Sequence, residues 1–213
     1  RMQITSIVCP QVETVLLQEL KHRHSNCLQL IAYSIARCGR QTTLAETQTM
    51  LADLEDRLFA HASLDRLLSE TPDPRLFENR CLAICLCLVR MFGREDITPY
   101  VHMNDAELSV GQAFWMSLIV AELVANALKH SLAREEGGSI WIDVRRLRQQ
   151  EVELTVSDSG RALLKGRQQG EPRIMSALVQ ILSGKIDVLD DDAYVTRIRV
   201  PLESKRRYAA EVV

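Results

Sequence analysis

Apolar residues recur at seven-residue intervals through the first third of the chain, and this spacing constrains the fold more than any other feature. Such a repeat is typical of long helices that pack along a common seam. It predicts one helix over about residues 11–37, which Gly39 ends, and a second over about residues 44–69. The seam positions of the first helix are Leu17, His24, Ile31 and Cys38 in one set, and Leu20, Cys27 and Ser34 in the other.

Two long helices joined by a short linker are expected to form an antiparallel hairpin. The hairpin carries more apolar surface than two helices alone can cover. We therefore predict a homodimer in which two hairpins form a four-helix bundle. His24 and His61 both fall at seam positions, where we expect a buried polar layer that fixes the register.

His22 lies two residues before a seam position, which places it on the solvent side of the first helix. Histidine titrates near neutral pH, so its ring offers a neutral, nucleophilic nitrogen in the cell. Arg23 is the next residue and could offset negative charge on a group that His22 attacks. His22 is therefore the candidate nucleophile.

The segment Thr71-Pro72-Asp73-Pro74 marks the clearest domain boundary, because two prolines within three residues end a helix. We assign residues 10–71 to the helical hairpin and residues 74–203 to a second domain. Residues 204–213 are charged and are expected to form a loose tail.

The second domain is expected to mix helices with strands. Asp73 and Ser109 stand where they can cap helices, and several short segments alternate apolar and polar residues as half-buried strands do. The expected helices cover residues 74–92, 111–132 and 173–182, and the expected strands cover 97–103, 139–147, 152–157, 185–189 and 194–201. Helices on one face of such an antiparallel-rich sheet give an α+β fold with two layers.

Composition argues against some partners. The net charge of −2 and the aromatic content of 5% give no reason to expect nucleic acid or a membrane surface. The longest apolar run, Cys81 to Val89, is too short to span a bilayer. The six cysteines contain no C-x-x-C pair and are interpreted as reduced, mostly buried residues of a cytoplasmic protein.

A polar stripe interrupts the apolar helix expected over residues 111–132. Glu122, Asn126, Lys129 and His130 fall on one helical face, while Leu118, Ile119, Leu123 and Ala127 are expected to face the sheet. Carboxylate and amide oxygens suit Mg²⁺, and a lysine suits phosphate. The alternative is an ordinary solvated helix face.

Asp158-Ser159-Gly160 follows a predicted strand. A carboxylate at this position could accept hydrogen bonds from an exocyclic amine, and the glycine would let the backbone approach a ligand. The alternative is a plain turn after a strand.

Together these segments resemble one family. His22-Arg23, followed by Asn26 and by Leu28-Gln29, resembles the phosphoacceptor motif H-R-x-x-N-x-L-Q of the second class of bacterial sensor histidine kinases. Residues 122–130 resemble the N box of the GHKL-type ATPase domain, and Asp158-Ser159-Gly160 resembles the start of its first glycine box. The resemblance extends over about residues 16–202.

The resemblance implies a dimeric bundle that carries a phosphohistidine at His22, followed by a two-layer sandwich of the GHKL (Bergerat) type. In that family pattern, Asn126 would bind Mg²⁺, Glu122 and Lys129 would serve the phosphates of ATP, and Asp158, with Gly160, would hold adenine.

The sequence departs from the family at three nucleotide-contacting elements. Ala162 replaces the second glycine of D-x-G-x-G, and residues 168–173 replace a G-x-G segment whose backbone amides cradle phosphate. There, Glu171 would repel phosphate and Pro172 lacks an amide donor. The late glycine-threonine pair is replaced by about Ala193-Tyr194. We therefore expect that ATP binding has been lost and that no cofactor is required.

The resulting hypothesis is a histidine phosphotransferase of a phosphorelay, in which His22 exchanges a phosphoryl group with aspartates of response-regulator receiver domains. Asn26 could orient the imidazole. The receiver domains are expected to dock near Gln29, Ala32, Tyr33 and Arg37. One alternative is a compact histidine kinase that uses ATP and Mg²⁺ to phosphorylate its own His22. The other is a non-catalytic module that binds response regulators without phosphoryl transfer.

Overall fold

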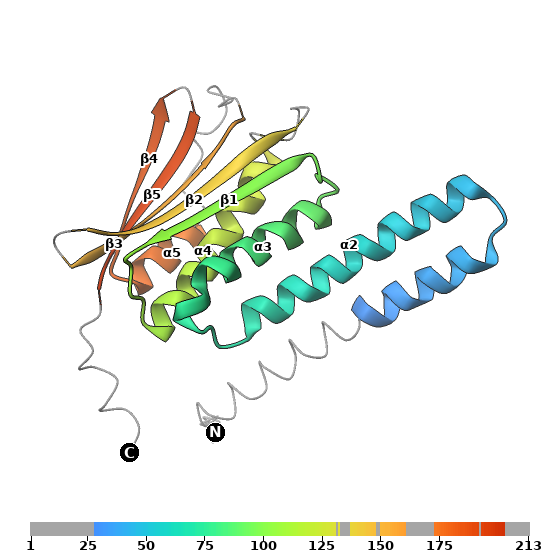
Figure 1. The fold of residues 1–213 in the computed structure, drawn as a ribbon, viewed down its shortest axis with the longest axis horizontal. Coiled ribbons are helices and arrows are strands. Elements are labelled where there is room, and N and C mark those ends of the chain that lie inside the picture. The colour runs from blue at the N-terminus through green and yellow to red at the C-terminus, as the bar shows by residue number, and fades with distance from the viewer. Residues whose placement is uncertain are drawn as a thin grey trace, which may run out of the picture. The chain divides into compact units, whose positions relative to one another are not determined.

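The computed structural model describes residues 28–130, 132, 137–147, 150–160, 173–191 and 193–202 (Figure 1). The chain divides into two compact units, with the boundary between Glu70 and Thr71. This boundary coincides with the start of the proline-containing segment.

The described part of the first unit consists of helical residues 28–41, a linker, and helix α2, Ala45–Ser69. The helix predicted over residues 44–69 is confirmed. Gly39 was expected to end the preceding helix, and that prediction was wrong, because the helix continues to residue 41. Gly39 instead lies beside Leu51, whose Cβ would be 3.6 Å from a Cβ added to the glycine.

The helix over residues 28–41 has one buried and one exposed side. Ala32 and Ala36 are buried, and the ring of Tyr33 meets the ring of Phe59 edge-on at a centroid distance of 5.5 Å. The exposed side includes an open apolar hollow of about 340 Å³, lined by Leu30, Ile31, Ser34, Ile35, Cys38 and Leu51. The complete hairpin and the dimer stay predictions, because the first half of the expected first helix lies outside the described residues.

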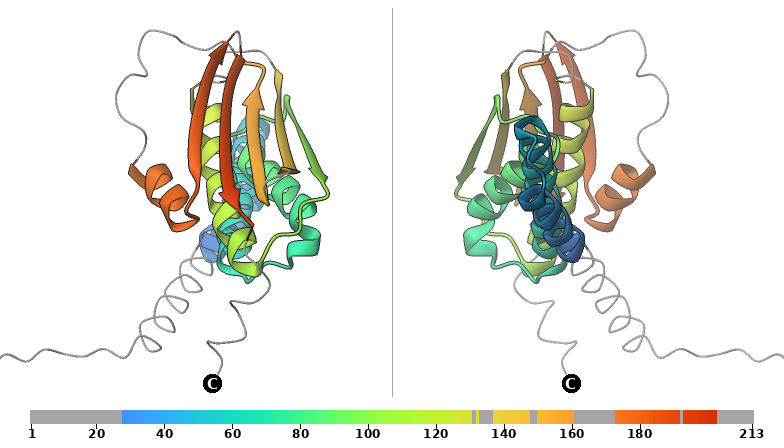
Figure 2. Two further views of the ribbon diagram at one scale, coloured as in Figure 1. Left: turned by 90° about the vertical axis from the view of Figure 1, so that its left-hand side faces the viewer. Right: turned by 90° about the vertical axis from the view of Figure 1, so that its right-hand side faces the viewer.

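The second unit is a mixed sheet with helices against one of its faces. A 3₁₀ turn, η1 (Pro74–Leu76), precedes the helices α3 (Phe77–Met91), α4 (Val110–Lys129) and α5 (Arg173–Ile181). The strands are β1 (Ile97–Asn104), β2 (Gly138–Leu147), β3 (Glu151–Asp158), β4 (Lys185–Asp191) and β5 (Ala193–Pro201). Their order is β1-β2-β3-β5-β4, and only β1 and β2 run parallel. The α+β prediction is confirmed, with all three helices on the same side of the sheet (Figure 2).

Alternation along the strands produces the core between the two layers. Through the middle of β2, β3 and β5, every second residue points toward the helices and is buried. These core residues include Ile140, Ile142, Val144, Val152, Leu154, Val156, Ile198 and Val200, which meet Met116, Ile119, Val120 and Val124 of α4. Each such side chain contributes roughly 1.5–3 kcal/mol when fully buried.

Two of the predicted caps are present. The Asp73 carboxylate accepts a hydrogen bond from the Arg75 backbone N–H at 3.0 Å. Ser109 Oγ accepts from the Gln112 N–H at 3.1 Å, while Gln112 Oε1 accepts from the Ser109 N–H at 3.0 Å. This reciprocal arrangement is a capping box. Gln112 also donates from Nε2 to the Pro201 carbonyl at 2.7 Å, so the start of α4 is tied to the end of β5.

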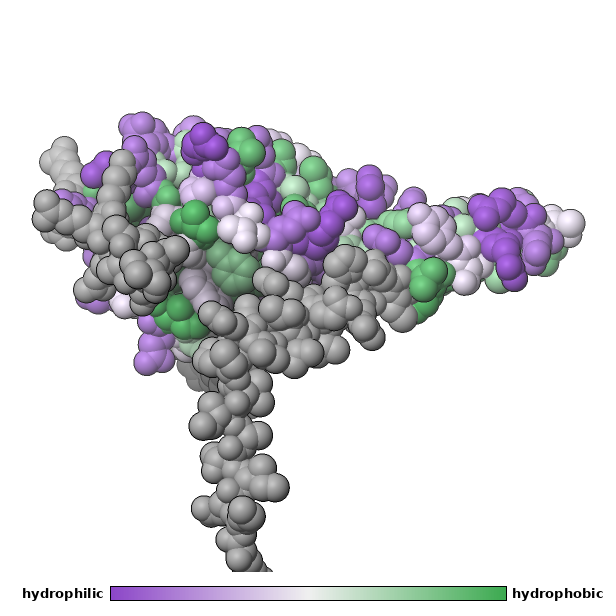
Figure 3. All heavy atoms as spheres, turned by 90° about the horizontal axis from the view of Figure 1, so that it is seen from below, coloured by the Kyte–Doolittle hydropathy of each residue, from purple (hydrophilic) through white to green (hydrophobic). Residues whose placement is uncertain are grey.

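Among the described helices, α4 is the one long and apolar enough to cross a membrane, and more than half of it is buried within the protein. This burial is that of a core helix, since α4 packs against α3, β3 and α5. On the face shown in Figure 3, hydrophobic residues of the described part form several small groups between hydrophilic ones.

We predict that Gln112→Leu lowers the free energy of unfolding by about 1–3 kcal/mol, because it removes half of the capping box and the hydrogen bond that the buried Gln112 side chain donates to the Pro201 carbonyl. Urea denaturation of the full chain measures the effect. Gln180→Leu, the same change at an exposed position of α5, is the matched control. Equal midpoints for the two variants would contradict the prediction.

Candidate functional site

The polar stripe of α4 brings Glu122 and Asn126 together. Both side chains are half-buried, and Asn126 Nδ2 lies 3.4 Å from Glu122 Oε1. The amide donates to the carboxylate, so Asn126 Oδ1 is oriented by this contact and stays available as an oxygen ligand. Leu118 was expected to face the sheet but is only half-buried, since it stands one turn before Glu122 on the same stripe.

Lys129 and His130 lie at the exposed end of this helix. Lys129 Nζ is 5.8 Å from the centre of the Phe92 ring, which follows α3. A cation over an exposed aromatic ring is held by only about 0.5–1 kcal/mol. The Lys129 side chain therefore points toward the end of α3. To bind a phosphate, its ammonium group would have to move away from the Phe92 ring, which would cost little free energy.

Asp158 is the last residue of β3, and its side chain is buried. Its Oδ1 accepts a hydrogen bond from the Gly160 N–H at 2.9 Å. The turn after it is braced by two further bonds: the Ser159 N–H donates to the Ser139 carbonyl at 3.0 Å, and the Ser139 N–H donates to Ser159 Oγ at 2.8 Å. Asp158 thus has a fixed position, and a ligand group would meet a preorganised carboxylate.

Gly138 makes this bracing possible. Its φ is +155°, and a Cβ added there would lie 2.7 Å from Ser159 Oγ and 2.9 Å from a Leu132 methyl carbon. Neither neighbour leaves room for a side chain. The sequence alone does not reveal this close approach, because it depends on the β2–β3 pairing.

A clamp that the sequence did not reveal holds the segment after α4. Arg94 forms an ion pair with Asp96 at 2.9 Å and donates a hydrogen bond to the Leu132 carbonyl. Asp96 in turn accepts a hydrogen bond from the Gly137 N–H at 2.7 Å. The Arg94 guanidinium lowers the pKa of Asp96 to about 2, so the clamp persists throughout the physiological pH range.

Thr196 is a second feature that sequence reasoning missed. It lies on β5 opposite Val156 of β3 and Val188 of β4, on the helix-facing side of the sheet. The residue is 1% exposed, and its hydroxyl has no hydrogen-bond partner in the part of the chain that the structure describes. An unpaired buried hydroxyl lowers stability, because its desolvation is not compensated.

Several predicted site residues lie outside the described residues, namely His22, Arg23 and Asn26 of the phosphoacceptor motif, and residues 161–172 of the loop after Gly160. In the expected docking set, Tyr33 and Arg37 are exposed and Gln29 is half-buried. Ala32 is fully buried and is withdrawn from this set, because its helical position places it on the covered side.

Within the described residues, no three His, Cys, Asp or Glu side chains come together as a protein-only metal cage would require. A magnesium ion held by Asn126 would not need one, since Mg²⁺ bound with a nucleotide takes few protein ligands and keeps its waters and phosphate oxygens. The Glu122–Asn126 pair and the buried Asp158 fit the metal and base ends of such a ligand.

Comparison with known proteins agrees with this geometry. Residues 111–204 match the family described as histidine kinase-, DNA gyrase B-, and HSP90-like ATPase. The sensor histidine kinase PdtaS of Mycolicibacterium smegmatis is 25% identical over 153 residues, which cover 70% of this chain and 30% of that protein. The chain therefore spans under a third of the length of this curated relative.

Two solved structures share the fold. The histidine kinase domain of the blue-light activated histidine kinase from Erythrobacter litoralis EL346 aligns with a TM-score of 0.57 and 18% identity, over 84% of this chain and 94% of that one. A longer chain of the same kinase aligns with a TM-score of 0.56 and 20% identity, over 85% of this chain and 60% of that one. Residues 111–204 are thus similar to the ATPase domains of that family, and the two solved structures show that the fold is histidine kinase-like.

We predict that Thr196→Val raises the free energy of unfolding by about 1 kcal/mol, because it removes an uncompensated buried hydroxyl and nearly preserves the volume. Thermal or urea denaturation measures the change. Thr155→Val, at a half-buried position on the opposite face of the sheet, is the matched control. A loss of stability in Thr196→Val that exceeds the control would show that the hydroxyl has a partner after all.

Proposed function

We propose that this protein is a histidine phosphotransferase of a phosphorelay. The observation that carries the proposal is a contrast within the sequence. The phosphoacceptor motif from His22 to Gln29 is complete, whereas the segment that would cradle the phosphates of ATP contains Ala162, Glu171 and Pro172. A nucleophile that cannot be charged from ATP depends on a phosphorylated partner.

The proposed reaction moves a phosphoryl group between an aspartate and His22. The unprotonated nitrogen of the neutral imidazole attacks the phosphorus of an aspartyl phosphate, a nitrogen–phosphorus bond forms, and the aspartate carboxylate leaves. The reverse step returns the group to the aspartate of another receiver domain. In-line placement supplies most of the rate enhancement, and the receiver brings Mg²⁺ and its acidic pocket.

Neighbouring residues of the motif would support this step. Arg23 would offset the charge of the transferred group, and Asn26, one turn after His22, would orient the imidazole. Gln29, the last residue of the motif, is half-buried, and Tyr33 and Arg37 are exposed farther along the chain. We propose these three residues as contacts for the receiver domain.

Dimerisation is part of the proposal. Ile31, Ser34 and Cys38, which the seven-residue repeat assigns to the seam, line the open apolar hollow of the first unit. An apolar surface of this kind is unfavourable in water and is covered when a second hairpin packs on it. We propose that a second copy of this chain covers it and completes a four-helix bundle, as a homodimer in the cytoplasm.

A second candidate function is that of an ATP-dependent kinase, and specific contacts favour it. Glu122 and Asn126 remain paired on α4, and Asp158 is buried and braced at the end of β3. These groups would hold the Mg²⁺ and the adenine of ATP, which would supply the phosphoryl group for His22. A third possibility, a module that only binds response regulators, makes no use of His22.

We predict that the full chain removes phosphoryl groups from a receiver domain charged with a small phosphodonor, and that label appears on the chain without added ATP. His22→Gln abolishes this transfer, because the attacking nitrogen is lost. The measurement follows radiolabel from receiver to chain by gel electrophoresis.

His130→Gln, the same change at an exposed histidine of the second unit, is the matched control and is expected to transfer normally. Label that reaches the His22→Gln variant, or a wild-type chain that accepts label only from ATP, would contradict the proposal.

A further inference from the structure

The face of the sheet that points away from α3, α4 and α5 carries no secondary-structure element among the described residues of the second unit (Figure 2). We call it the outer face. Its side chains alternate with the buried core residues along each strand, so its composition is not needed for the core. Two features on this face, an aromatic pair and an arginine cluster, are unlike an ordinary solvated surface.

The aromatic pair is formed by Tyr100 of β1 and Trp141 of β2. These residues are direct neighbours in the parallel β1–β2 register, and their rings stack with centroids 6.1 Å apart at an interplanar angle of 13°. Tyr100 is 53% and Trp141 is 39% exposed. Aromatic residues make up only 5% of this chain, yet two of them meet on an open surface.

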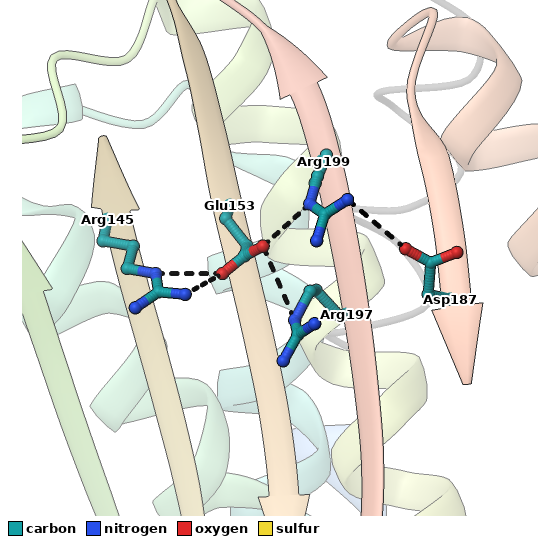
Figure 4. A network of polar contacts seen from close by, with 5 residues as sticks. All are labelled: Arg145, Glu153, Asp187, Arg197 and Arg199. Carbon is teal, nitrogen blue, oxygen red and sulfur yellow. Dashed lines mark hydrogen bonds and ion pairs between the residues drawn. The ribbon is translucent and has the colours of Figure 1, made fainter. Parts of the chain in front are cut away.

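The arginine cluster surrounds Glu153 (Figure 4). Arg145 of β2 donates from Nε and Nη2 to Glu153 Oε1 at 2.9 and 2.6 Å, and Arg199 of β5 donates from Nε to Oε2 at 2.8 Å. Arg197 Nε lies 3.5 Å from Oε2. Burial raises the pKa of the Glu153 carboxyl, but Arg199 and Arg145 more than offset this, so its pKa is lowered.

The cluster presents cations to the solvent and hides its anion. Glu153 is 1% exposed, whereas the side chain of Arg145 is 60% exposed. Three guanidinium groups offer more N–H donors than one carboxylate can accept, even with Asp187 near Arg199 at 3.7 Å. Arg197 Nε is buried, so the N–H groups open to solvent are the remaining ones of Arg145 and of Arg199, whose side chain is 38% exposed. Donors therefore remain for an outside carboxylate.

The composition of the outer face favours a protein as its occupant. Tyrosine, tryptophan and arginine are the residues most enriched at energetically important positions of protein interfaces. Carboxylates of Asp143, Glu151 and Asp187 stand among the cations of the same face. They would repel the uniformly charged backbone of a nucleic acid or an anionic membrane, while a protein segment can place single carboxylates opposite single guanidiniums.

The size of the outer face indicates a transient contact. Five strands spaced about 4.8 Å apart, with lengths of 7 to 10 residues at about 3.3 Å per residue, give roughly 650 Å² of flat area. A stable interface needs about 800 Å² per partner. A permanent dimer through this face is therefore disfavoured, whereas a short segment of a partner protein fits.

We propose that the outer face is a docking surface for an acidic segment of a partner protein, which places an apolar side chain on Tyr100 and Trp141 and carboxylates on Arg145 and Arg199. The docking surface lies apart from the Glu122–Asn126 stripe, because that stripe is on α4, on the other side of the sheet. Docking at this surface is a binding event only and does not require phosphoryl transfer at His22.

The test uses a synthetic, fluorescently labelled peptide of 12 residues in which glutamates flank a central phenylalanine. Fluorescence anisotropy with the full chain is expected to show saturable binding that weakens as salt is added, because exposed charge pairs are screened. Trp141→Ser and Arg145→Gln each weaken binding about tenfold, since each removes a central contact. Arg90→Gln, at an exposed arginine on α3 in the helix layer, leaves binding unchanged within about twofold.

Arg145→Gln keeps Arg199 and Arg197 on Glu153, and a melting curve for each variant shows that the domain is folded. Three outcomes overturn the proposal. The first is the absence of binding at about 1 mM peptide, where even weak interfaces are populated. The second is equal binding by all the variants. The third is tighter binding of a single-stranded RNA or of anionic vesicles than of the peptide.

Discussion

The packing of α4 against the inner face of the sheet is the contact on which the rest of the second unit depends. One side of the helix supplies core residues such as Met116, Ile119 and Val124, and the half-buried Glu122–Asn126 pair lies at the margin of that side. The helix is fixed at both ends. Gln112 ties its start to β5, and the Arg94–Asp96 clamp holds the segment that follows its end. Any ligand that meets Asn126 therefore meets a side chain on a rigid support.

Much of the fold could be predicted from local patterns in the sequence. Alternating residues marked every strand, seven-residue spacing marked α2, and Asp73 and Ser109 stood where the caps are found. The misplaced element ends have local causes. The helix before α2 continues past Gly39, because the glycine lies in helical conformation beside Leu51. The α4 helix ends at Lys129 rather than near Leu132, whose carbonyl is taken by Arg94.

The parts of the candidate site that depend on helix periodicity could be predicted from the sequence. The parts that depend on strand pairing could not. Spacing alone placed Glu122 and Asn126 on one face. The bracing of Asp158 by Ser139 and Ser159, the close approach of Gly138, and the unpartnered hydroxyl of Thr196 depend on which strands are neighbours and in which register. Sequence order does not reveal a β1-β2-β3-β5-β4 sheet, so these features appear only in the structure.

The two sides of the sheet have different proposed functions. On the helix side, the end of β3 carries a braced carboxylate and α4 carries an oriented amide, which we propose are the remainder of a nucleotide site, while the segment proposed to contact phosphate contains Ala162, Glu171 and Pro172. The outer face carries exposed aromatic rings and guanidinium groups that the core does not use. We therefore propose that this domain acts as a structural and docking partner of the helices and not as a source of phosphate.

The measurement that tests this account most directly is calorimetric titration of the full chain with ATP and Mg²⁺, with Asn126→Ala as the control variant. The account predicts no binding at millimolar ATP, since a backbone cradle that lacks its donors cannot offset the charge of a triphosphate. Micromolar binding that disappears in Asn126→Ala would contradict it, and would make this protein a compact kinase that phosphorylates its own histidine.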